Sequence, residues 1–119
     1  MKTTELGRFG EERAAAYLRR RGYRIVERNF SCREGEIDII ARKGGYVVFV
    51  EVKLRKNADF AAAREFVTRA KQQRIITTAS VWLAQSGCEL QPRFDVIEVY
   101  APRGAEGRTE INHLRNAFE

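Results

Sequence analysis

Hydrophobic positions recur with helical spacing in two parts of the chain. In the first, they predict a helix over residues 5–21 that ends at Gly22, and Thr3 or Thr4 is expected to cap its start. A second helix is expected from about residue 61 to just before Gly87. Its inward stripe is expected to comprise Phe66, Val67, Ala70, Ile75, Ala79, Trp82 and Leu83.

Between and after these helices, runs rich in β-branched and aromatic residues predict five strands. The strands are expected at residues 23–29, 36–42, 46–54, 93–100 and 110–114, with a polar turn at 31–34 and loops at 56–59 and 102–108. The order is therefore α-β-β-β-α-β-β, which predicts an α/β or α+β protein with a mixed central sheet. With no internal repeat and no long linker, residues 1–119 are expected to form a single domain.

The strand predicted over residues 46–54 combines apolar and charged positions. It is apolar on both faces at its start, so we expect it to lie in the middle of the sheet. Because side chains alternate between faces, the face that carries Val47 and Phe49 continues into Glu51 and Lys53. Burial of Glu51 is costly unless a partner compensates its charge.

The preceding strand is expected to bring such partners. A two-residue Gly-Gly turn at 44–45 places Asp38 opposite Glu51 and Glu36 opposite Lys53, and residues directly opposite share a face. A four-residue loop gives the same register, whereas a loop of three or five residues would shift it. The register thus predicts one patch of four charged side chains.

The chemistry of this patch suits a divalent cation. Asp38 and Glu51 would repel each other if both were ionised, and a cation between them removes that conflict. Carboxylate and water oxygens favour Mg²⁺ or Mn²⁺ over zinc, and Lys53 is placed to hold an attacking water or stabilise a phosphoryl oxyanion. The alternative is a salt-bridged strand face open to water; the apolar density of VVFVEV favours the catalytic patch.

Two helical residues are candidates to join the patch. Glu11 lies at the border of the first helix's buried stripe, where it can support a metal site or be an ordinary boundary glutamate. Lys71 lies four residues from both Val67 and Ile75, where it can contact phosphate or pack its stem on the core. Gln72 is a weaker candidate for the same region.

Further basic residues follow the patch along the chain. A phosphate-binding rim, or alternatively a set of solvated charges, is expected from Arg55, Lys56, Arg64, Arg69 and Arg74. His113 is expected to be structural. Core positions are expected for Tyr17, Tyr23, Phe30 and Trp82.

Composition narrows the function classes. The chain has 22 Lys and Arg against 16 Asp and Glu, a net charge of +6, which suits a nucleic-acid binder and equally suits simple solubility. The hydrophobic fraction of 44% argues against disorder. No apolar run is long enough to cross a membrane, and the charged N-terminal residues argue against a signal peptide, so a cytoplasmic protein is expected. Cys32 and Cys88 are too few for a disulfide framework or a zinc site.

Several segments together resemble a known family. They are GRFGEERAAAYLRRRGY, ERNFSCREGEIDIIA, VVFVEVKLR, VTRAKQQRI, RFDVIEV and INHLRNAF, in this order along nearly the whole chain. They resemble the YraN-like family of uncharacterised bacterial proteins. That family is similar to Holliday junction resolvases of archaeal type, in the PD-(D/E)xK nuclease superfamily.

The resemblance implies a restriction-endonuclease-like fold, in which helices flank a mixed central sheet. It also implies roles for particular residues: motif acids and lysine at Asp38, Glu51 and Lys53, a metal-binding carbonyl at Val52, a helical acid at Glu11 and a helical base at Lys71. One departure is Ile37, where the motif's name has proline.

These implications predict a nuclease that requires Mg²⁺ or Mn²⁺ and hydrolyses DNA, including branched DNA or repair and recombination intermediates. A homodimer would suit such substrates, because a junction has two symmetric cuts. Two alternatives remain: a non-catalytic nucleic-acid-binding protein that recruits a repair or recombination partner, and an RNA-processing nuclease.

Overall fold

The computed structural model describes residues 5–55, 67–102 and 107–119. The elements are α1 (Glu5–Arg20), β1 (Arg24–Cys32), β2 (Gly35–Lys43), β3 (Tyr46–Arg55), α2 (Arg69–Ser86), β4 (Gln91–Tyr100) and β5 (Glu110–Phe118). This order matches the predicted α-β-β-β-α-β-β. Among the described residues, no helix has the length and apolar character needed to cross a membrane.

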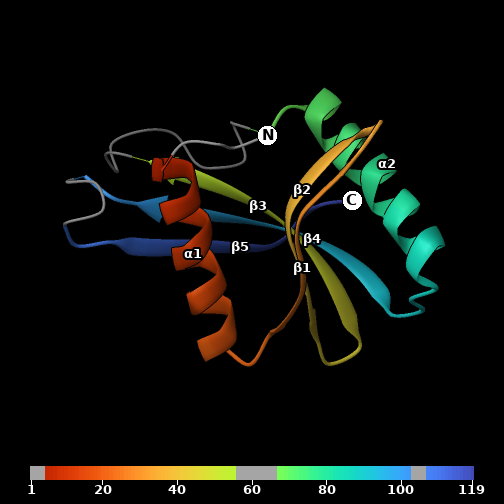
Figure 1. Ribbon diagram of the computed structural model, residues 1–119, viewed down its shortest axis with the longest axis horizontal. Coiled ribbons are helices and arrows are strands. Elements are labelled where there is room, and N and C mark those ends of the chain that lie inside the picture. Colours follow the sequence, from red (N-terminus) through yellow and green to blue (C-terminus); the bar gives the residue numbers. More distant parts are fainter. Residues whose placement is uncertain (1–4, 56–66, 103–106) are drawn as a thin grey trace.

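The strands form one mixed sheet in the order β1-β2-β3-β4-β5. Neighbouring strands are antiparallel except β3 and β4, which are parallel. The central position of β3 confirms the expectation from its two apolar faces. In Figure 1, α1 lies over the sheet and α2 lies beside the β1–β2 hairpin; each helix packs on its own cluster of buried side chains.

The α1 cluster forms because one stripe of the helix carries small and apolar residues. Ala14, Ala15 and Leu18 are fully buried against β3 and β4. A Cβ atom built on Gly10 would lie 3.5 Å from the Leu54 side chain, so this part of α1 runs close to the end of β3. The helix ends at Arg20, and Gly22 follows in the turn with a φ of 88°, which favours glycine.

The α2 cluster uses the spacing of Ile75, Ala79 and Trp82, all buried as predicted. Thr68 caps the helix by accepting a hydrogen bond from the Lys71 backbone N–H at 3.2 Å. The predicted start near residue 61 lies outside the described residues, as does Phe66. Within them, the helix begins at Arg69.

Because α2 begins so late, two members of its predicted stripe behave differently. Val67 is buried but precedes the helix, and Ala70 is exposed, so its predicted inward position is wrong. In the first turn, the cap and not the apolar stripe determines which face is inward.

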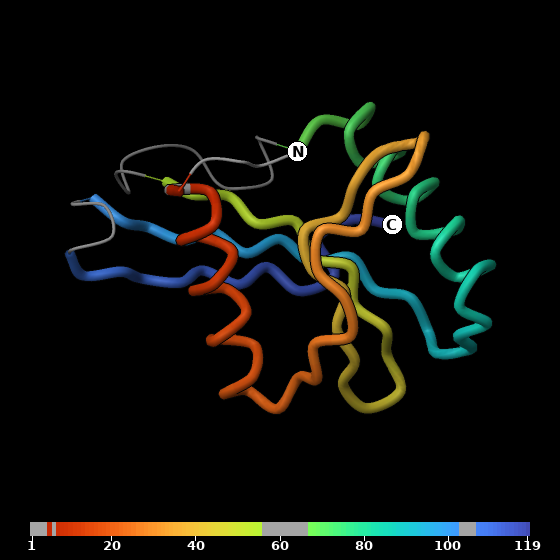
Figure 2. The backbone as a smooth tube through the Cα atoms, viewed as in Figure 1, coloured from red at the N-terminus to blue at the C-terminus, as the bar shows by residue number. Residues whose placement is uncertain are grey.

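β1 and β5 extend furthest beyond their predicted ends. β1 extends through Ser31 and Cys32, which pair with Glu36 and Gly35, so the turn contains only residues 33 and 34. β5 continues to Phe118 because its end packs into the α2 cluster. The polar residues near the ends of β1 and β5 suggested that these strands would end earlier. They are tolerated because β1 and β5 are the two edge strands of the sheet. Figure 2 shows β1 and β2 bending together away from the rest of the sheet.

Candidate active site

The candidate site begins where the β2–β3 ladder ends. The pairs run from Lys43 opposite Tyr46 to Ile39 opposite Val50, the register predicted from the Gly-Gly turn. The next predicted pair, Asp38 with Glu51, is not part of the ladder.

The pair expected after that is also missing. Glu36 does not lie opposite Lys53 in the ladder; it pairs instead with Ser31 of β1. The physical reason is the bend of the β1–β2 hairpin. In the part of β2 before Ile39, β2 remains paired with β1 and separates from β3. The two strands thus diverge at the point where their charged residues begin.

Asp38 bridges this divergence through its side chain. It is only 3% exposed, and its Oδ2 accepts a hydrogen bond of 2.8 Å from the backbone N–H of Val52. Beyond the end of the ladder, a carboxylate oxygen therefore satisfies this buried amide. The bond fixes Asp38 beside the residue that follows Glu51.

Glu51 lies on the face of β3 that packs against α2, after Val47 and Phe49, as predicted. It is 7% exposed, and its Oε2 contacts two ammonium groups. Lys71 Nζ lies at 2.6 Å and Lys53 Nζ at 3.4 Å. The buried charge is therefore compensated from its own strand and from α2.

The two lysines differ in their pKa values. Burial lowers the pKa of Lys53, the hydrogen bond with the Lys71 amine lowers it further, and the attraction of Glu51 does not restore it. Burial also acts against a charged Lys71, but the contacts with Glu51 outweigh it and raise the pKa of Lys71 above its ordinary value. Lys71 is thus the permanent counter-ion of Glu51, and Lys53 loses its proton more readily.

A cavity of about 300 Å³ adjoins Lys71. It is lined by Gly35, Glu36, Lys71, Arg74 and Ile75, so the expected rim residue Arg74 lies beside Lys71. Gln72 does not join them by any described contact. Its Nε2 donates to the carbonyl of Val67 at 3.0 Å and so supports the start of α2.

Glu11 approaches from the other side of the sheet. It is 2% exposed on α1, and its described ion pair is with Arg28 Nη2 at 4.0 Å. Within residues 5–55, 67–102 and 107–119, no three carboxylate, histidine or cysteine side chains gather as a metal-binding group. The structure therefore does not bring Glu11 together with Asp38 and Glu51 as direct ligands.

Sequence reasoning missed Glu98, a buried acid on the sheet face that carries Glu51 and Lys53. Glu98 lies opposite Lys53 in the parallel β3–β4 register and is fully buried. It accepts hydrogen bonds from Tyr100 at 2.9 Å and Asn112 at 2.8 Å, and its Oε2 lies 3.7 Å from Nε of Arg55. Burial and the neighbouring Glu98 raise the pKa of Tyr100.

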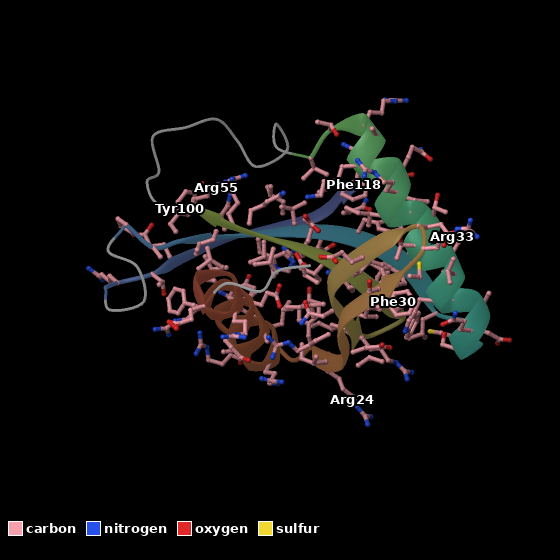
Figure 3. The ribbon with its side chains drawn as sticks, turned by 45° about the horizontal axis from the view of Figure 1, so that its top comes forward. Arg24, Phe30, Arg33, Arg55, Tyr100 and Phe118 are labelled. Atoms are coloured by element: carbon pink, nitrogen blue, oxygen red, sulfur yellow. The ribbon has the colours of Figure 1, made fainter. Side chains whose placement is uncertain are left out.

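The contact between Glu98 and Arg55 argues against a solvent-facing Arg55 in the predicted phosphate-binding rim. Arg55 and Tyr100 lie side by side at the ends of β3 and β4 (Figure 3), and Arg55 is held by a buried acid instead of extending into solvent. Alternation along β4 puts residue 98 on the face of Val96, which was the signal available in the sequence. Lys56 and Arg64 lie outside the described residues, and Arg69 is exposed at the start of α2.

The donors around Asp38 and Glu51 fit a hard divalent cation. Two carboxylates and the nearby Val52 carbonyl are all oxygen ligands, which suit Mg²⁺ or Mn²⁺ and not zinc. In addition, the buried carboxylate of Glu51 already lies beside two cationic side chains, Lys53 and Lys71, which compensate its charge. The types of oxygen donor present are therefore compatible with such a cation, and the metal site itself stays a prediction.

Comparison with known proteins gives one consistent family. The sequence model of the uncharacterised protein family UPF0102 matches residues 10–99, a stretch that contains every candidate described above from Glu11 to Glu98. The chain is 46% identical over 114 residues to a UPF0102 protein of Caldanaerobacter subterraneus subsp. tengcongensis, covering 95% of this chain and 93% of the relative. It is 47% identical over 114 residues to a UPF0102 protein of Symbiobacterium thermophilum, covering 95% of each. A UPF0102 protein of Geobacter sulfurreducens is 47% identical over 120 residues, covering 96% of this chain and 88% of the relative.

Proposed function

We propose that this chain, which belongs to the uncharacterised protein family UPF0102, is a divalent-metal-dependent nuclease that hydrolyses phosphodiester bonds in DNA. The observation that carries the proposal is Glu51, a buried carboxylate held between Lys53 and Lys71. Asp38 is fixed beside it through the Val52 backbone N–H. Two buried acids and a lysine of lowered pKa, placed where the β2–β3 ladder ends, are typical of a catalytic site.

The fold supports the same proposal. A mixed sheet with a helix on each face is what the resemblance to PD-(D/E)xK nucleases implies. The motif acids and lysine would be Asp38, Glu51 and Lys53. We therefore assign the chain a restriction-endonuclease-like fold as part of the proposal.

In this mechanism, Asp38, Glu51 and the Val52 carbonyl would hold Mg²⁺ or Mn²⁺. When bound, the ion supplies a Lewis acid that polarises the phosphodiester and acidifies water. Lys53 takes the proton of the attacking water, because its lowered pKa gives a larger neutral fraction than an ordinary lysine has. Water oxygen bonds to phosphorus, the bond to the leaving oxygen breaks, and that oxygen takes a proton from solvent.

Lys71 and Arg74 act on the substrate side. Lys71 offsets the charge of Glu51 and lines the adjoining cavity, which Arg74 also lines. Both cations can receive the non-bridging oxygens of the scissile or a neighbouring phosphate. The net charge of +6 favours a polyanionic substrate, which includes branched DNA and repair or recombination intermediates. Glu11 would support the site indirectly, since its ion-pair partner Arg28 lies opposite Ile39, the residue that follows Asp38.

Metal binding is the first test. Manganese is titrated by calorimetry into wild type, into Asp38→Asn with Glu51→Gln, and into Glu89→Gln, which removes an exposed acid far along the chain. We expect binding in wild type and in Glu89→Gln, and none in the double variant. Equal manganese binding by all three proteins would refute the metal site.

Cleavage is the second test. Wild type, Asp38→Ala, Lys53→Ala and Glu89→Gln are incubated with manganese and linear duplex, four-way junction, single-stranded DNA or RNA. We expect cleavage of at least one DNA by wild type and Glu89→Gln, with losses of at least about 100-fold in the other two. Activity of wild-type level in both Asp38→Ala and Lys53→Ala would refute the mechanism. Cleavage of RNA alone would assign the same chemistry to RNA processing.

One observation favours a second candidate function. Among the residues that the structure describes, Lys53 and Lys71 already compensate Glu51, so the patch can be stable as a purely structural element. The chain would then be a non-catalytic nucleic-acid-binding protein that recruits a repair or recombination partner. This function predicts DNA binding that weakens steeply with salt and is the same with manganese or EDTA.

A further inference from the structure

A small basic pocket lies at the end of α1, apart from the candidate active site. It is a cavity of about 140 Å³ lined by Tyr17, Arg21, Tyr23, Lys43, His113 and Arg115. These residues come from α1 and the segment after it, from the end of β2 and from β5. None of them contacts Asp38, Glu51 or Lys71 in any described interaction, and Tyr17 and Tyr23 pack with the α1 cluster on the other face of the sheet.

Two of the three basic side chains that line this pocket lie over aromatic rings. The guanidinium of Arg21 lies 5.0 Å from the ring centroid of Tyr17, and Lys43 Nζ lies 4.9 Å from that of Tyr23. Lys43 also donates to the carbonyl of Arg21 at 2.7 Å. Across residues 5–55, 67–102 and 107–119, no carboxylate forms an ion pair with Arg21, Lys43 or Arg115. The pocket therefore concentrates positive charge that the described protein does not neutralise.

Asp95, a fully buried acid, is hydrogen-bonded to the lining residue His113, but its charge is already compensated. Asp95 accepts hydrogen bonds from Arg93 at 3.0 and 2.8 Å, from His113 Nε2 at 2.7 Å and from the Asn116 backbone N–H at 2.9 Å. Burial acts to raise the pKa of Asp95, but the bonds from His113 and Arg93 outweigh it and hold the pKa below its ordinary value. The charges of Asp95 and Arg93 thus cancel, and the positive charges of the lining residues remain uncompensated by Asp95.

The same network sets the direction of the two hydroxyl groups. An ionised Asp95 can only accept, so His113 Nε2 donates to it, and in the neutral ring Nδ1 accepts the Tyr17 hydroxyl at 3.1 Å. The Tyr23 hydroxyl accepts from Arg93 Nη2 at 2.7 Å, which leaves its own hydrogen for a further acceptor. The pocket therefore offers a phenolic donor together with its cations.

We propose that this pocket binds a phosphate group. A cavity of about 140 Å³ has room for a group with four oxygens, since one water takes about 30 Å³ of liquid volume. The multiple charge of phosphate suits the cations, and the arginine fork pairs with two of its oxygens. The group can come from the phosphorylated end of a nucleic-acid strand or from free phosphate and small phosphate esters.

The test is calorimetric titration with inorganic phosphate. Wild type is compared with Arg21→Gln/Arg115→Gln and with the control Arg19→Gln/Arg20→Gln, which removes equal charge from exposed positions outside the pocket. We expect the phosphate Kd to rise at least about tenfold in the pocket variant and to stay within about threefold in the control. If wild type binds no phosphate, or if both variants weaken equally, the proposal is wrong. Lys43→Gln gives the same comparison if circular dichroism shows that the pocket variant is unfolded.

A second arm identifies the source of the phosphate. Fluorescence anisotropy compares an oligonucleotide with a 5′-phosphate, a 3′-phosphate or neither. A gain of at least about fivefold from a terminal phosphate, abolished by inorganic phosphate or by the pocket variant, identifies a strand end as the ligand. Phosphate binding without that gain identifies free phosphate or a small ester. Phosphate binding in this pocket involves neither Asp38 nor Glu51, so failure here and failure of the proposed nuclease are separable.

Discussion

Replacing Lys71 by methionine tests the electrostatics of the candidate site directly. The change removes the ammonium that lies 2.6 Å from Glu51 Oε2 and keeps an unbranched apolar stem on α2. Lys53 remains at 3.4 Å as the other partner of that oxygen. Glu51 stays buried, so its charge must then be compensated by Lys53 alone.

The loss of stability should be moderate. Removing one partner of a fully buried ion pair costs about 3–5 kcal/mol, whereas exposed pairs contribute about 0.2–1 kcal/mol. The side chain of Lys71 is 37% exposed and that of Glu51 is 8% exposed, and a second cation remains. We therefore expect the free energy of unfolding to fall by about 1 kcal/mol at neutral pH.

The pH dependence has a defined sign. Because the folded-state pKa of Lys71 is raised, its contribution is fully present below the unfolded-state value and is lost as pH rises through the folded-state value. The difference between wild type and Lys71→Met should thus be present at pH 7 and shrink above about pH 10. In the same variant, the pKa of Lys53 should rise, because the lowering by Lys71 is gone although burial remains.

Urea denaturation at several pH values measures the first effect, and NMR titration of isotope-labelled lysine side chains measures the second. Arg69→Met is the matched control, since it removes an exposed cation from the same helix and should change stability by less than about 0.5 kcal/mol. Equal stability of the two variants, together with an unchanged Lys53 pKa, would refute the proposed coupling.

Three further predictions concern the fold that carries the site, and each is measured by urea or thermal denaturation. Phe49→Ala should cost about 3–5 kcal/mol, because Phe49 is 1% exposed in the α2 cluster; a loss below about 1 kcal/mol would contradict that packing. Thr68→Ala should cost about 1 kcal/mol through the lost α2 cap, and Thr68→Ser should retain most of the stability. Gly35→Ala should cost more than about 1 kcal/mol, since φ is 154° and the new Cβ would lie 3.0 Å from Thr78 Oγ1. Gly45→Ala, where a Cβ meets nothing within 4 Å, is its control.

Features set by local pattern were predictable from the sequence. Alternation along residues 46–54 predicted which face of β3 carries Glu51, and the Gly-Gly turn predicted the register up to Ile39 and Val50. Membership of the YraN-like family, UPF0102, was likewise recognisable from motifs along the chain. In each case, neighbouring residues alone contain the necessary information.

Features that depend on distant segments were not predictable. The register was extended to the Asp38–Glu51 pair because a pattern in two strands cannot show that β2 bends away with β1. The contacts of Glu98 depend on β3 and β4 being parallel neighbours, with Arg55 and Asn112 supplied by strands on either side. The phosphate pocket was missed for the same reason, since it joins α1 to the ends of β2 and β5.

The geometry of Glu51 shows why its site depends on the rest of the fold. A carboxylate that is 7% exposed would cost several kcal/mol if left unpaired. Lys53 follows it on the strand, but its own pKa is lowered by burial, so it is a weak counter-ion. Lys71, the stronger partner, reaches Glu51 only when α2 packs through Ile75 and Trp82. Packing of α2 therefore sets the charge balance of the site. Loosening that helix should leave Glu51 to Lys53 and raise the pKa of Lys53, which would weaken the proposed water activation.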